Sequence, residues 1–600
     1  MNSNDRANLI KRINTLEGLT DKERSALLGL LRENKTYGLV WEDKPEDVEE
    51  RLRDELPILT EVPERAILSE DKDAPNHILI EGDNLEALAT LAYTHEGKID
   101  VIYIDPPYNT GNKDFIYNDS YVDKEDSYRH SKWLSFMSRR LNIAKKLLSE
   151  RGVIFISIDD NEQAQLKLLC DEIFKASNYI GTIIWKKKTN GNNMGLIPPV
   201  HDYIVCFSKK NENINAEDFG LPLSKEYIQK TYKNPDNDPR GPWTTTDLSA
   251  NHKGPYFPIK NPVTGEIHYP SQGRYWVFNE KEVLRRIKEG LIIFGKSGNA
   301  KPVQKVFLKD RKLKKLPVDS WWDKHGLNED GTMELFNIFG KNKIFIHPKP
   351  TITIKHLLNL SSTVNSIILD FFAGSGTTLH ATMQLNAEDR GHRQCILVTN
   401  NENNICEEVT YERNRRVIQG YTNAKGEEVV GLTKNNLRYY RTGFVGRSRS
   451  MQNMRKLVNL ATDMLCIKEN LYTEQNIFGG QKTYKNVFRY FDDGKKQMLV
   501  IYREEAIDEL VDIIYDMDIS QPIKVYVFSP SEDPWEGSFD DVSDKVELCA
   551  LPQAIYNTYR RILPKKKDAV VMPEEDALAS TQEEEDLFNG MLNFTDEEEA

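Results

Sequence analysis

Short apolar runs separated by amphipathic stretches dominate two parts of the chain. Patterns of buried strands occupy 77–84, 98–104 and 152–160, and each is followed by a stretch with helical spacing of apolar residues. Apolar strands that alternate with helices are typical of a parallel sheet covered by helices on both faces. We therefore expect a doubly wound α/β core, with two further strands at 179–187 and 202–210.

This alternation is interrupted between about 211 and 340. Glycine, proline, asparagine and tryptophan are frequent there, in stretches such as DPRGPW and DSWWDKHG, which favours short strands and turns. The alternation resumes at SIILDFFAGSGTT (366–378) and continues through a strand at 394–401 and a helix at 406–421. The interrupted segment is therefore predicted to be an insertion between two halves of one sheet.

Changes in pattern and composition divide the chain into segments. The last thirty residues hold 11 acidic and no basic residues, a composition typical of disorder. A smaller α/β unit, with strands QMLVIY and IKVYVF, precedes them. We expect a helical N-terminal region (1–70), the first half of the core (71–210), the insertion (211–340), the second half of the core (341–440), an accessory domain (441–570) and an acidic disordered tail (571–600).

Charge is distributed unevenly along the chain. The whole sequence carries a formal net charge of −13, yet residues 181–350 hold 28 lysines and arginines against 18 aspartates and glutamates. A basic middle flanked by acidic regions is consistent with a localised polyanion-binding face, and equally with an ordinary solvated surface. The six cysteines form no CxxC pair and cluster with no histidine, which argues against zinc and against a disulfide framework.

The sequence also bears on location. No apolar run approaches the roughly 18–20 residues of a membrane span, and the N-terminus lacks the apolar core of a signal peptide. We therefore expect a cytoplasmic protein without membrane association.

Two motifs follow strands of the predicted core. The first, IDPPYNTG (104–111), ends its strand because proline has no N–H donor and a fixed φ. The second, DFFAGSGTT (370–378), is a glycine-rich turn, where backbone N–H groups approach a cofactor in doubly wound sheets. It is not a Walker A loop, which requires lysine at the position of Thr377. Taken alone, each motif is equally compatible with a purely structural turn.

Together the two motifs resemble those of the S-adenosylmethionine-dependent DNA amino-methyltransferases. Their order, with DPPY before FAGSGTT and a variable region between, is that of the circularly permuted beta group. Four further stretches, YGLVWEDKPE, LIEGDNLEAL, DPRGPW and FIHPKP, are similar to the modification subunit of Type III restriction-modification systems. The resemblance covers about 36–440 and implies a permuted, Rossmann-like methyltransferase sheet with an inserted target-recognition region.

The resemblance implies that S-adenosylmethionine binds at the glycine-rich turn. The turn would line the methionine end of the cofactor, Asp83 would reach the adenosine, and Asn400 or Glu402 would bind the ribose. The implied cofactor residues are Asp370, Phe371, Phe372, Ala373, Gly374, Ser375, Gly376, Thr377, Thr378, Lys349, Pro350, Asp83, Asn400 and Glu402.

The resemblance also implies catalysis by Asp105, Pro106, Pro107 and Tyr108. An exocyclic amino group of a base is a poor nucleophile because its lone pair is delocalised into the ring. The Asp105 carboxylate and the Pro106 carbonyl would accept its hydrogens, and Tyr108 would stack on a base flipped out of the duplex. Adenine-N6 is the favoured target, and cytosine-N4 is the alternative, although a serine in place of Asp105 is more typical of that group. Carbon-5 methylation is excluded, because none of the six cysteines follows a proline.

The insertion is expected to contact double-stranded DNA. Its candidates for phosphate or base contacts are Arg240, Lys253, Arg274, Lys296, Lys301, Lys305, Arg311 and Lys312. Before the insertion, Lys186, Lys187 and Lys188 are expected to form a basic loop beside the catalytic edge, and the resemblance places His201 and Tyr203 beside the flipped base. The expected partners are DNA, a second copy of this chain and a separate restriction subunit, since the sequence contains no helicase or nuclease motif. A stand-alone adenine methyltransferase, a non-catalytic DNA-binding specificity subunit, and an RNA or protein methyltransferase are the other hypotheses.

Overall fold

The structure, a computed structural model, covers the core of the chain and most of the insertion. Most of the first 38 residues of the predicted helical N-terminal region, the whole acidic segment 571–600, and Lys296 and Lys312 lie outside the residues it describes. No helix within the described residues is long and apolar enough to cross a membrane. The described residues are 12–13, 20, 39–191, 196–215, 219–295, 300–311 and 315–564.

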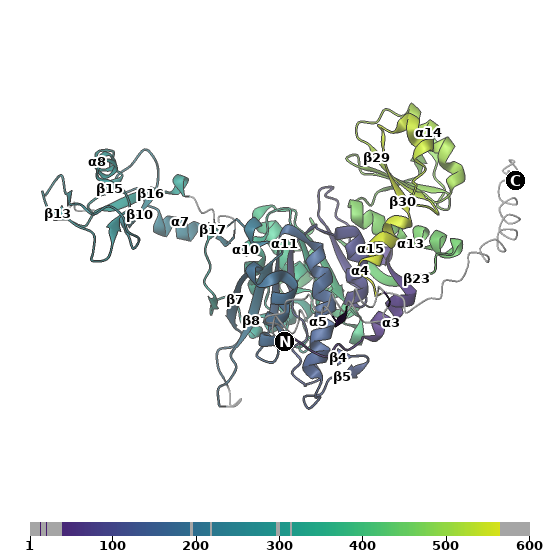
Figure 1. The fold of residues 1–600 in the computed structure, drawn as a ribbon, viewed down its shortest axis with the longest axis horizontal. Coiled ribbons are helices and arrows are strands. Elements are labelled where there is room, and N and C mark those ends of the chain that lie inside the picture. The colour runs from purple at the N-terminus through teal and green to yellow at the C-terminus, as the bar shows by residue number, and fades with distance from the viewer. Residues whose placement is uncertain are drawn as a thin grey trace, which may run out of the picture.

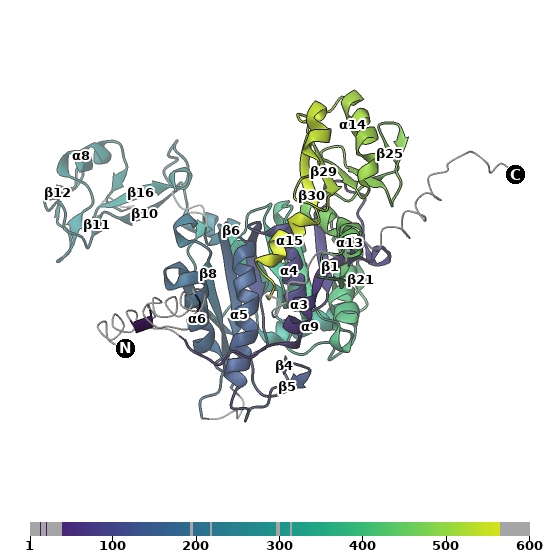
Figure 2. The same cartoon turned by 45° about the vertical axis from the view of Figure 1, so that its right-hand side comes forward.

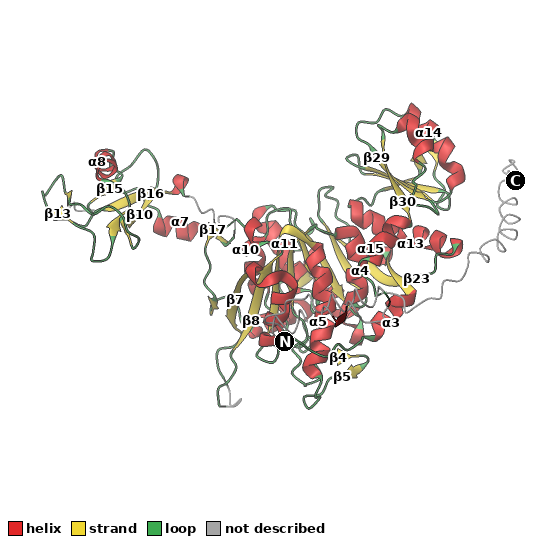
Figure 3. Ribbon diagram, in the orientation of Figure 1, coloured by secondary structure: helices red, strands yellow, loops and turns green. Residues whose placement is uncertain are grey.

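A ten-stranded sheet forms the centre of the molecule (Figures 1 and 3). Only β1 and β8 run antiparallel to the other strands, so the predicted doubly wound, mostly parallel sheet is confirmed. Strands from the two halves of the core interleave in this sheet. Its order is β1 (Glu55–Glu61), β23 (Asn436–Gly446), β2 (Asn76–Glu81), β20 (Gln394–Thr399), β19 (Ile367–Asp370), β3 (Ile99–Ile104), β6 (Leu148–Ile158), β8 (His201–Ser208), β7 (Tyr179–Lys186) and β18 (Trp321–Trp322).

Helices cover both faces of this sheet (Figure 2). Side chains alternate along each strand, so Ile78 and Ile80 pack into one core and Leu79 into the other. The helices of the first core are α4 (Asn84–His95), α5 (Arg129–Leu147), α6 (Gln163–Cys170), α13 (Met451–Glu469) and α15 (Gln553–Arg560), preceded by α3 (Asp47–Asp54). The helices of the second core are α9 (Asn328–Phe339), α10 (Thr351–Ser361), α11 (Thr377–Asp389) and α12 (Glu412–Gln419).

The chain between β8 and β18 forms an arm that projects from the sheet, on the left in Figure 1. Its two-stranded stalk pairs β9 (Leu221–Pro222) with β17 (Lys315–Leu316), and short strands and turns make up the rest, as the composition predicts. The arm returns to the body at β18, which pairs with β7 inside the main sheet. The other elements of the arm are α7 (Lys225–Thr231), β10 (Trp243–Asp247), β11 (Ser249–Ala250), β12 (Ile259–Lys260), β13 (Ile267–His268), β14 (Tyr275–Trp276), α8 (Glu280–Lys288), β15 (Ile292–Ile293) and β16 (Val303–Phe307).

A second, five-stranded sheet lies in the C-terminal part, at the upper right in Figure 1. The helices α13 and α15, which precede and follow it in sequence, pack on α4 of the main body. Tyr559 of α15 also donates a hydrogen bond of 2.6 Å to the carbonyl oxygen of Pro57 in β1. The segment predicted as an accessory domain therefore begins and ends against the core. This sheet consists of β24 (Glu474–Gln475), β27 (Phe488–Asp492), β28 (Gln497–Ile501), β29 (Ile523–Phe528) and β30 (Val546–Leu551), with α14 (Ile507–Asp516) packed on it.

A buried arginine joins the segment before α3 to α4 and α5. Arg140 of α5 donates from Nη1 to Glu46 Oε1 at 2.8 Å and from Nε to Asn84 Oδ1. The Arg140 side chain is 1% exposed and the Glu46 side chain 8%. Burial raises the pKa of the Glu46 carboxyl group, and the charge of Arg140 opposes that rise. Each side chain of this pair therefore offsets the cost of burying the charge of the other.

We expect Arg140→Ala to lower the free energy of unfolding by about 3–5 kcal/mol, because it leaves the Glu46 carboxyl buried without its partner. Urea unfolding measures this change. Arg285→Ala is the control, since Arg285 forms ion pairs only on the exposed face of α8, where such pairs contribute little. Equal losses in both variants would contradict the role of Arg140.

Candidate active site

The two sequence motifs meet at the carboxyl ends of adjacent parallel strands. Ile102 of β3 is paired with Leu369 of β19, so Asp105 and Asp370 reach the same edge of the sheet. From this point the chain progresses in opposite directions, from β19 to β20 on one side and from β3 to β6 on the other. The crevice at such a switch point is the common ligand site of doubly wound sheets.

Asp105 lies in a compact cluster of three polar side chains. Lys349 Nζ donates to Asp105 Oδ2 at 2.6 Å and to the Tyr108 hydroxyl at 3.0 Å. That hydroxyl donates to Asp105 Oδ1 at 2.9 Å, and burial raises its pKa well above the usual value, which keeps it protonated. The sequence motif predicts Lys349 as a cofactor residue, whereas the structure places its ammonium on the predicted catalytic carboxylate.

The second proline of the motif is held by the neighbouring helix α5. Pro106 and Pro107 follow the last residue of β3, as predicted. Trp133 of α5, which is fully buried, donates from Nε1 to the Pro107 carbonyl oxygen at 2.7 Å. The motif therefore has a fixed backbone on both sides of the Asp105 carboxylate. Trp133 is not among the residues predicted for the site, because no motif of the sequence contains it.

The glycine-rich turn fits tightly against its surroundings. Gly374 and Gly376 have φ values of 48° and 73°, which favour glycine. A Cβ atom on Gly376 would lie 2.5 Å from Asn414 Nδ2, and one on Gly374 would lie 3.0 Å from the ring of Phe345. The side chains of Thr410 and Arg413 hold the turn from behind, donating to the Gly374 carbonyl at 2.6 Å and to Thr377 Oγ1 at 2.7 Å.

Asp370 ties the start of this turn to the helix that follows it. Its Oδ1 accepts from the Phe372 backbone N–H at 3.0 Å, and its Oδ2 accepts from Thr378 Oγ1 at 2.6 Å. Burial raises the pKa of the Asp370 carboxyl group to about 7, although both hydrogen bonds act against that rise. The structural role of Asp370 is therefore to shape the turn through its buried carboxyl group.

The other residues predicted for the cofactor lie around this edge in different settings. Asp83 caps α4 by accepting from the Leu85 N–H at 2.7 Å, and the adjacent Asn84 donates to the Phe371 carbonyl at 3.2 Å. Asn400 and Glu402 are exposed beyond the end of β20. Partial desolvation by neighbouring parts of the chain, and then the charges of Asp119 and Asp83, raise the pKa of Glu402. Ala373 and Ser375 are buried within the turn, and Pro350 is the N-cap of α10.

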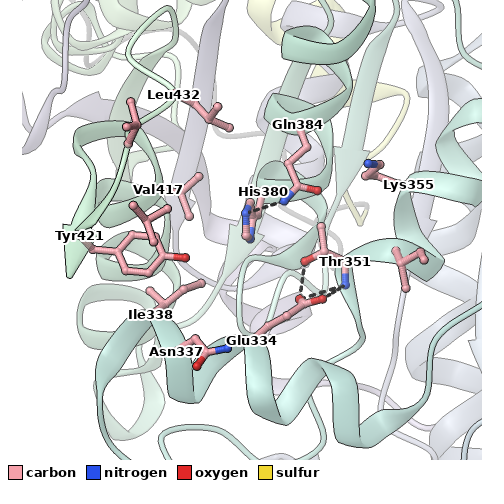
Figure 4. Close-up of a pocket in the computed structure, with 13 residues that line it drawn as sticks. Glu334, Asn337, Ile338, Thr351, Lys355, His380, Gln384, Val417, Tyr421 and Leu432 are labelled. Carbon is pink, nitrogen blue, oxygen red and sulfur yellow. Dashed lines mark hydrogen bonds between the residues drawn. The ribbon is translucent and has the colours of Figure 1, made fainter. Parts of the chain in front are cut away.

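A cavity of about 400 Å³ lies behind the glycine-rich turn, among α9 to α12 and the hairpin of β21 (Tyr421–Thr422) and β22 (Glu428–Val429) (Figure 4). Glu334 in its wall accepts from the backbone N–H and the hydroxyl group of Thr351. Arg413 donates to the same Thr351 hydroxyl at 3.1 Å and also to the turn. Arg413 therefore connects this wall to the glycine-rich turn.

The residues predicted to contact DNA lie in different settings. Lys305 is 7% exposed and forms ion pairs with Asp236 and Asp238, so it belongs to the interior of the arm, and its prediction as a DNA contact is corrected. Other predicted residues have partners within the protein: Arg240 with Asp238, Arg274 with Asp247, Arg311 with Tyr232, Lys187 with Asp202, Tyr203 with Asp160, and the His201 ring with the Tyr203 ring. Lys253 and Lys301 are exposed on the arm, and Lys186 and Lys188 lie where β7 ends.

The family model described as "DNA methylase" matches residues 99–418, just over half of the chain. The chain belongs to this DNA methylase family. The match begins at β3 and ends in α12, so it contains both the Asp105 cluster and the glycine-rich turn. The predicted membership of a family of DNA methyltransferases is thereby confirmed.

Curated relatives extend this similarity. The Mod subunit of the type III restriction-modification enzyme StyLTI of Salmonella typhimurium is 37% identical over 363 residues, covering 56% of this chain and 54% of that protein. The Mod subunit of EcoP15I of Escherichia coli is 30% identical, covering 63% and 66%. The type II methyltransferase M.KpnI of Klebsiella pneumoniae is 33% identical, covering 58% and 87%. The chain thus spans between half and two thirds of the length of these Mod subunits.

Solved structures are similar at a much lower level. A putative DNA modification methylase from Thermus thermophilus, complexed with S-adenosyl-L-methionine, covers 60% of this chain and 99% of its own, with 16% sequence identity. The TM-score of 0.30 is too low to support a functional comparison.

A comparison of two glycines with similar positive φ values separates the cost of crowding at the turn from the cost of backbone strain. Gly376 has φ 73° and Gly97 has φ 71°, but a Cβ atom on Gly97 would meet nothing within 4 Å. We expect Gly97→Ala to lower the free energy of unfolding by about 1 kcal/mol. Gly376→Ala should cost a further 1–3 kcal/mol or so, because Asn414 must move. Urea unfolding of both variants measures the difference, and equal losses would show that Asn414 yields freely.

Proposed function

We propose that this chain transfers a methyl group from S-adenosylmethionine to the N6 amino group of adenine in double-stranded DNA. The observation that carries the proposal is the pairing of β3 with β19, which sets the Asp105 cluster beside the glycine-rich turn. Family membership supports methylation of DNA in general. The choice of adenine rests on the aspartate that begins the DPPY motif.

The glycine-rich turn suits the proposed cofactor. S-adenosylmethionine supplies an electrophilic methyl group on a positively charged sulfur atom. In doubly wound sheets a glycine-rich turn after a strand brings backbone N–H groups close to a ligand, and the positive φ values of Gly374 and Gly376 shape such a turn here. Acidic groups stand around the same edge, at Asp83, Asp370 and Glu402, and suit the cationic and hydroxyl groups of such a ligand. In this proposal Asp370 shapes the turn, and Glu402 is the candidate for the ribose.

Asp105 would act on the target amino group. A carboxylate offers about four lone-pair sites, and Lys349 and Tyr108 use one each, so Asp105 retains capacity for the amino hydrogens. With the Pro106 carbonyl, it would favour a pyramidal nitrogen whose lone pair can attack the methyl group. The Lys349 ammonium fixes the carboxylate before the base arrives, and such preorganisation is a main source of catalysis. The ring of Tyr108 would stack on the flipped base.

The arm is proposed as the target-recognition region. It projects from the sheet between β8 and β18, and the segment containing it has an excess of basic residues. Lys253 and Lys301 are exposed there, and would add to binding through phosphates rather than through bases. Lys186 and Lys188, at the end of β7, would approach the backbone near the flipped base.

The similarity to Mod subunits supports a place in a Type III-like restriction-modification system, with a separate restriction subunit as partner. A second copy of this chain and a cytoplasmic location stay predictions. A stand-alone methyltransferase is the second candidate, favoured by the match that covers 87% of the type II methyltransferase M.KpnI.

Replacing the catalytic carboxylate should separate chemistry from cofactor binding. We expect Asp105→Ala to lower the turnover rate of methyl transfer by about 10²–10³-fold, and to change the dissociation constant of S-adenosylmethionine less than about threefold. Tritiated-methyl incorporation and calorimetric titration measure the two quantities. Asp512→Ala, on the exposed side of α14, is the control. Parallel loss of binding and transfer in Asp105→Ala would contradict this assignment.

The target base can be identified without knowing the recognition sequence. DNA from methylation-deficient cells that express the protein should contain N6-methyldeoxyadenosine, and DNA from cells that express Asp105→Ala should not. Nucleoside mass spectrometry measures both. Appearance of N4-methyldeoxycytidine instead would replace adenine by cytosine as the target.

A further inference from the structure

A buried carboxyl group lies against the residue that follows the DPPY motif. Asn109 comes directly after Tyr108, is completely buried and has φ 58°, in the left-handed region. Its Nδ2 donates to Glu162 Oε1 at 2.6 Å and to the Arg129 carbonyl oxygen at 3.2 Å. Glu162, which lies just beyond β6, is also completely buried. The end of the motif is therefore attached, through this side-chain contact, to the residue that precedes α6.

A histidine also contacts the Glu162 oxygen that accepts from Asn109. His130 Nδ1 lies 2.6 Å from Glu162 Oε1, and Arg129 Nε donates to His130 Nε2 at 3.2 Å. Since Nε2 accepts a hydrogen bond, Nδ1 carries the ring proton of a neutral histidine. Nδ1–H therefore donates a hydrogen bond to Glu162 Oε1. Burial, and then the charge of Arg129, lower the pKa of His130, in agreement with a neutral ring. Glu162 Oε1 thus accepts two hydrogen bonds.

The remaining oxygens of the two side chains lack a donor. Glu162 Oε2 and Asn109 Oδ1 are both buried, and neither receives a hydrogen bond from the described part of the chain. An unsatisfied buried acceptor is costly, and these two belong to side chains that are already joined through Asn109 Nδ2 and Glu162 Oε1. A proton on Oε2 would remove both deficits at once, because Oε2–H could then donate to Asn109 Oδ1.

We propose that Glu162 is a neutral carboxylic acid joined to the Asn109 amide by two parallel hydrogen bonds, and that it is the positioning residue of the DPPY motif. In this pair Asn109 Nδ2 donates to Oε1, and Oε2–H donates to Asn109 Oδ1. The pair holds the left-handed turn directly after Tyr108, and so fixes how the ring faces the base. This role rests on the proposed methyl transfer, whereas the acid–amide pair itself does not.

The electrostatic surroundings agree with a neutral Glu162. Burial raises the pKa of its carboxyl group to about 8, the hydrogen bond from Asn109 and the charge of Arg129 lower it, and Asp159 raises it. His130 faces the same carboxyl as a neutral ring, and Gln165 contacts that ring at 3.5 Å. At pH 7 most Glu162 side chains are therefore protonated, and above pH 8 ionisation sets a charge against Asn109 Oδ1.

Methyl transfer to unmethylated bacterial chromosomal DNA, measured from pH 6.5 to 9.5, tests the positioning role. Transfer by the native protein should fall about tenfold between pH 7 and 9, as the protonated fraction falls. Glu162→Gln keeps one acceptor and one donor for Asn109 but does not titrate, so it should lose this fall while its transfer at pH 7 stays within about threefold. Glu162→Ala should lose at least about tenfold throughout.

Glu86→Gln is the control for removal of a buried carboxyl group. Burial raises the pKa of Glu86 to about 7, and this residue accepts from Thr442, away from the DPPY motif. The variant should keep the alkaline fall of the native protein. An alkaline fall that persists in Glu162→Gln, or full transfer by Glu162→Ala, would overturn the positioning role.

Thermal unfolding tests the pair without any assay of activity. A carboxyl group with a raised pKa binds a proton in the native state that the unfolded chain has lost. Its contribution to stability is therefore complete below about pH 4.5 and is lost as the pH rises to about 8. The melting temperature of the native protein, relative to Glu162→Gln, should fall over this range and then level off. A constant difference would overturn the acid–amide pair, whereas the expected fall without detectable methyl transfer would overturn only the proposed function.

Discussion

The pairing of β3 with β19 is the constraint on which the whole site depends. These strands come from distant parts of the chain, and the intervening sequence supplies β6, β7, β8, the arm and β18 on the far side of β3. Their register is fixed because both faces of the sheet are buried, and a slip of one residue would exchange the side chains of the two cores. The polar ends at Asp105 and Asp370 are thus positioned by apolar packing behind them.

Lys349 joins the two halves of this site in two ways. Its ammonium binds Asp105 and Tyr108, while its backbone carbonyl accepts from Thr377 Oγ1 at 3.2 Å at the start of α11. A movement of the glycine-rich turn would therefore be transmitted to the predicted catalytic carboxylate through one residue. Arg413 holds the same Thr377 hydroxyl from the second core. The turn and the carboxylate form one connected polar network in a largely apolar body.

The sequence predicted the parts of the structure that local patterns determine. Apolar strands followed by turn-forming residues revealed the sheet, and DPPY and the glycine-rich turn revealed its functional edge. Contacts between distant segments were beyond such patterns: Lys305 has the appearance of a surface charge but is buried against two aspartates. The return of the arm through Trp322 into the main sheet was missed for the same reason. Asn109 and Glu162, 53 positions apart, carry no joint signal in one sequence.

Hydrogen–deuterium exchange with and without S-adenosylmethionine tests the account most directly, because it reports on both motifs in one experiment. If one ligand occupies the crevice between β3 and β19, the amides of 371–378 and those of Tyr108 and Asn109 should become protected together. Amides of the arm should change only after DNA is added. Protection confined to α9 and the hairpin 421–429, around the cavity behind the turn, would contradict the account.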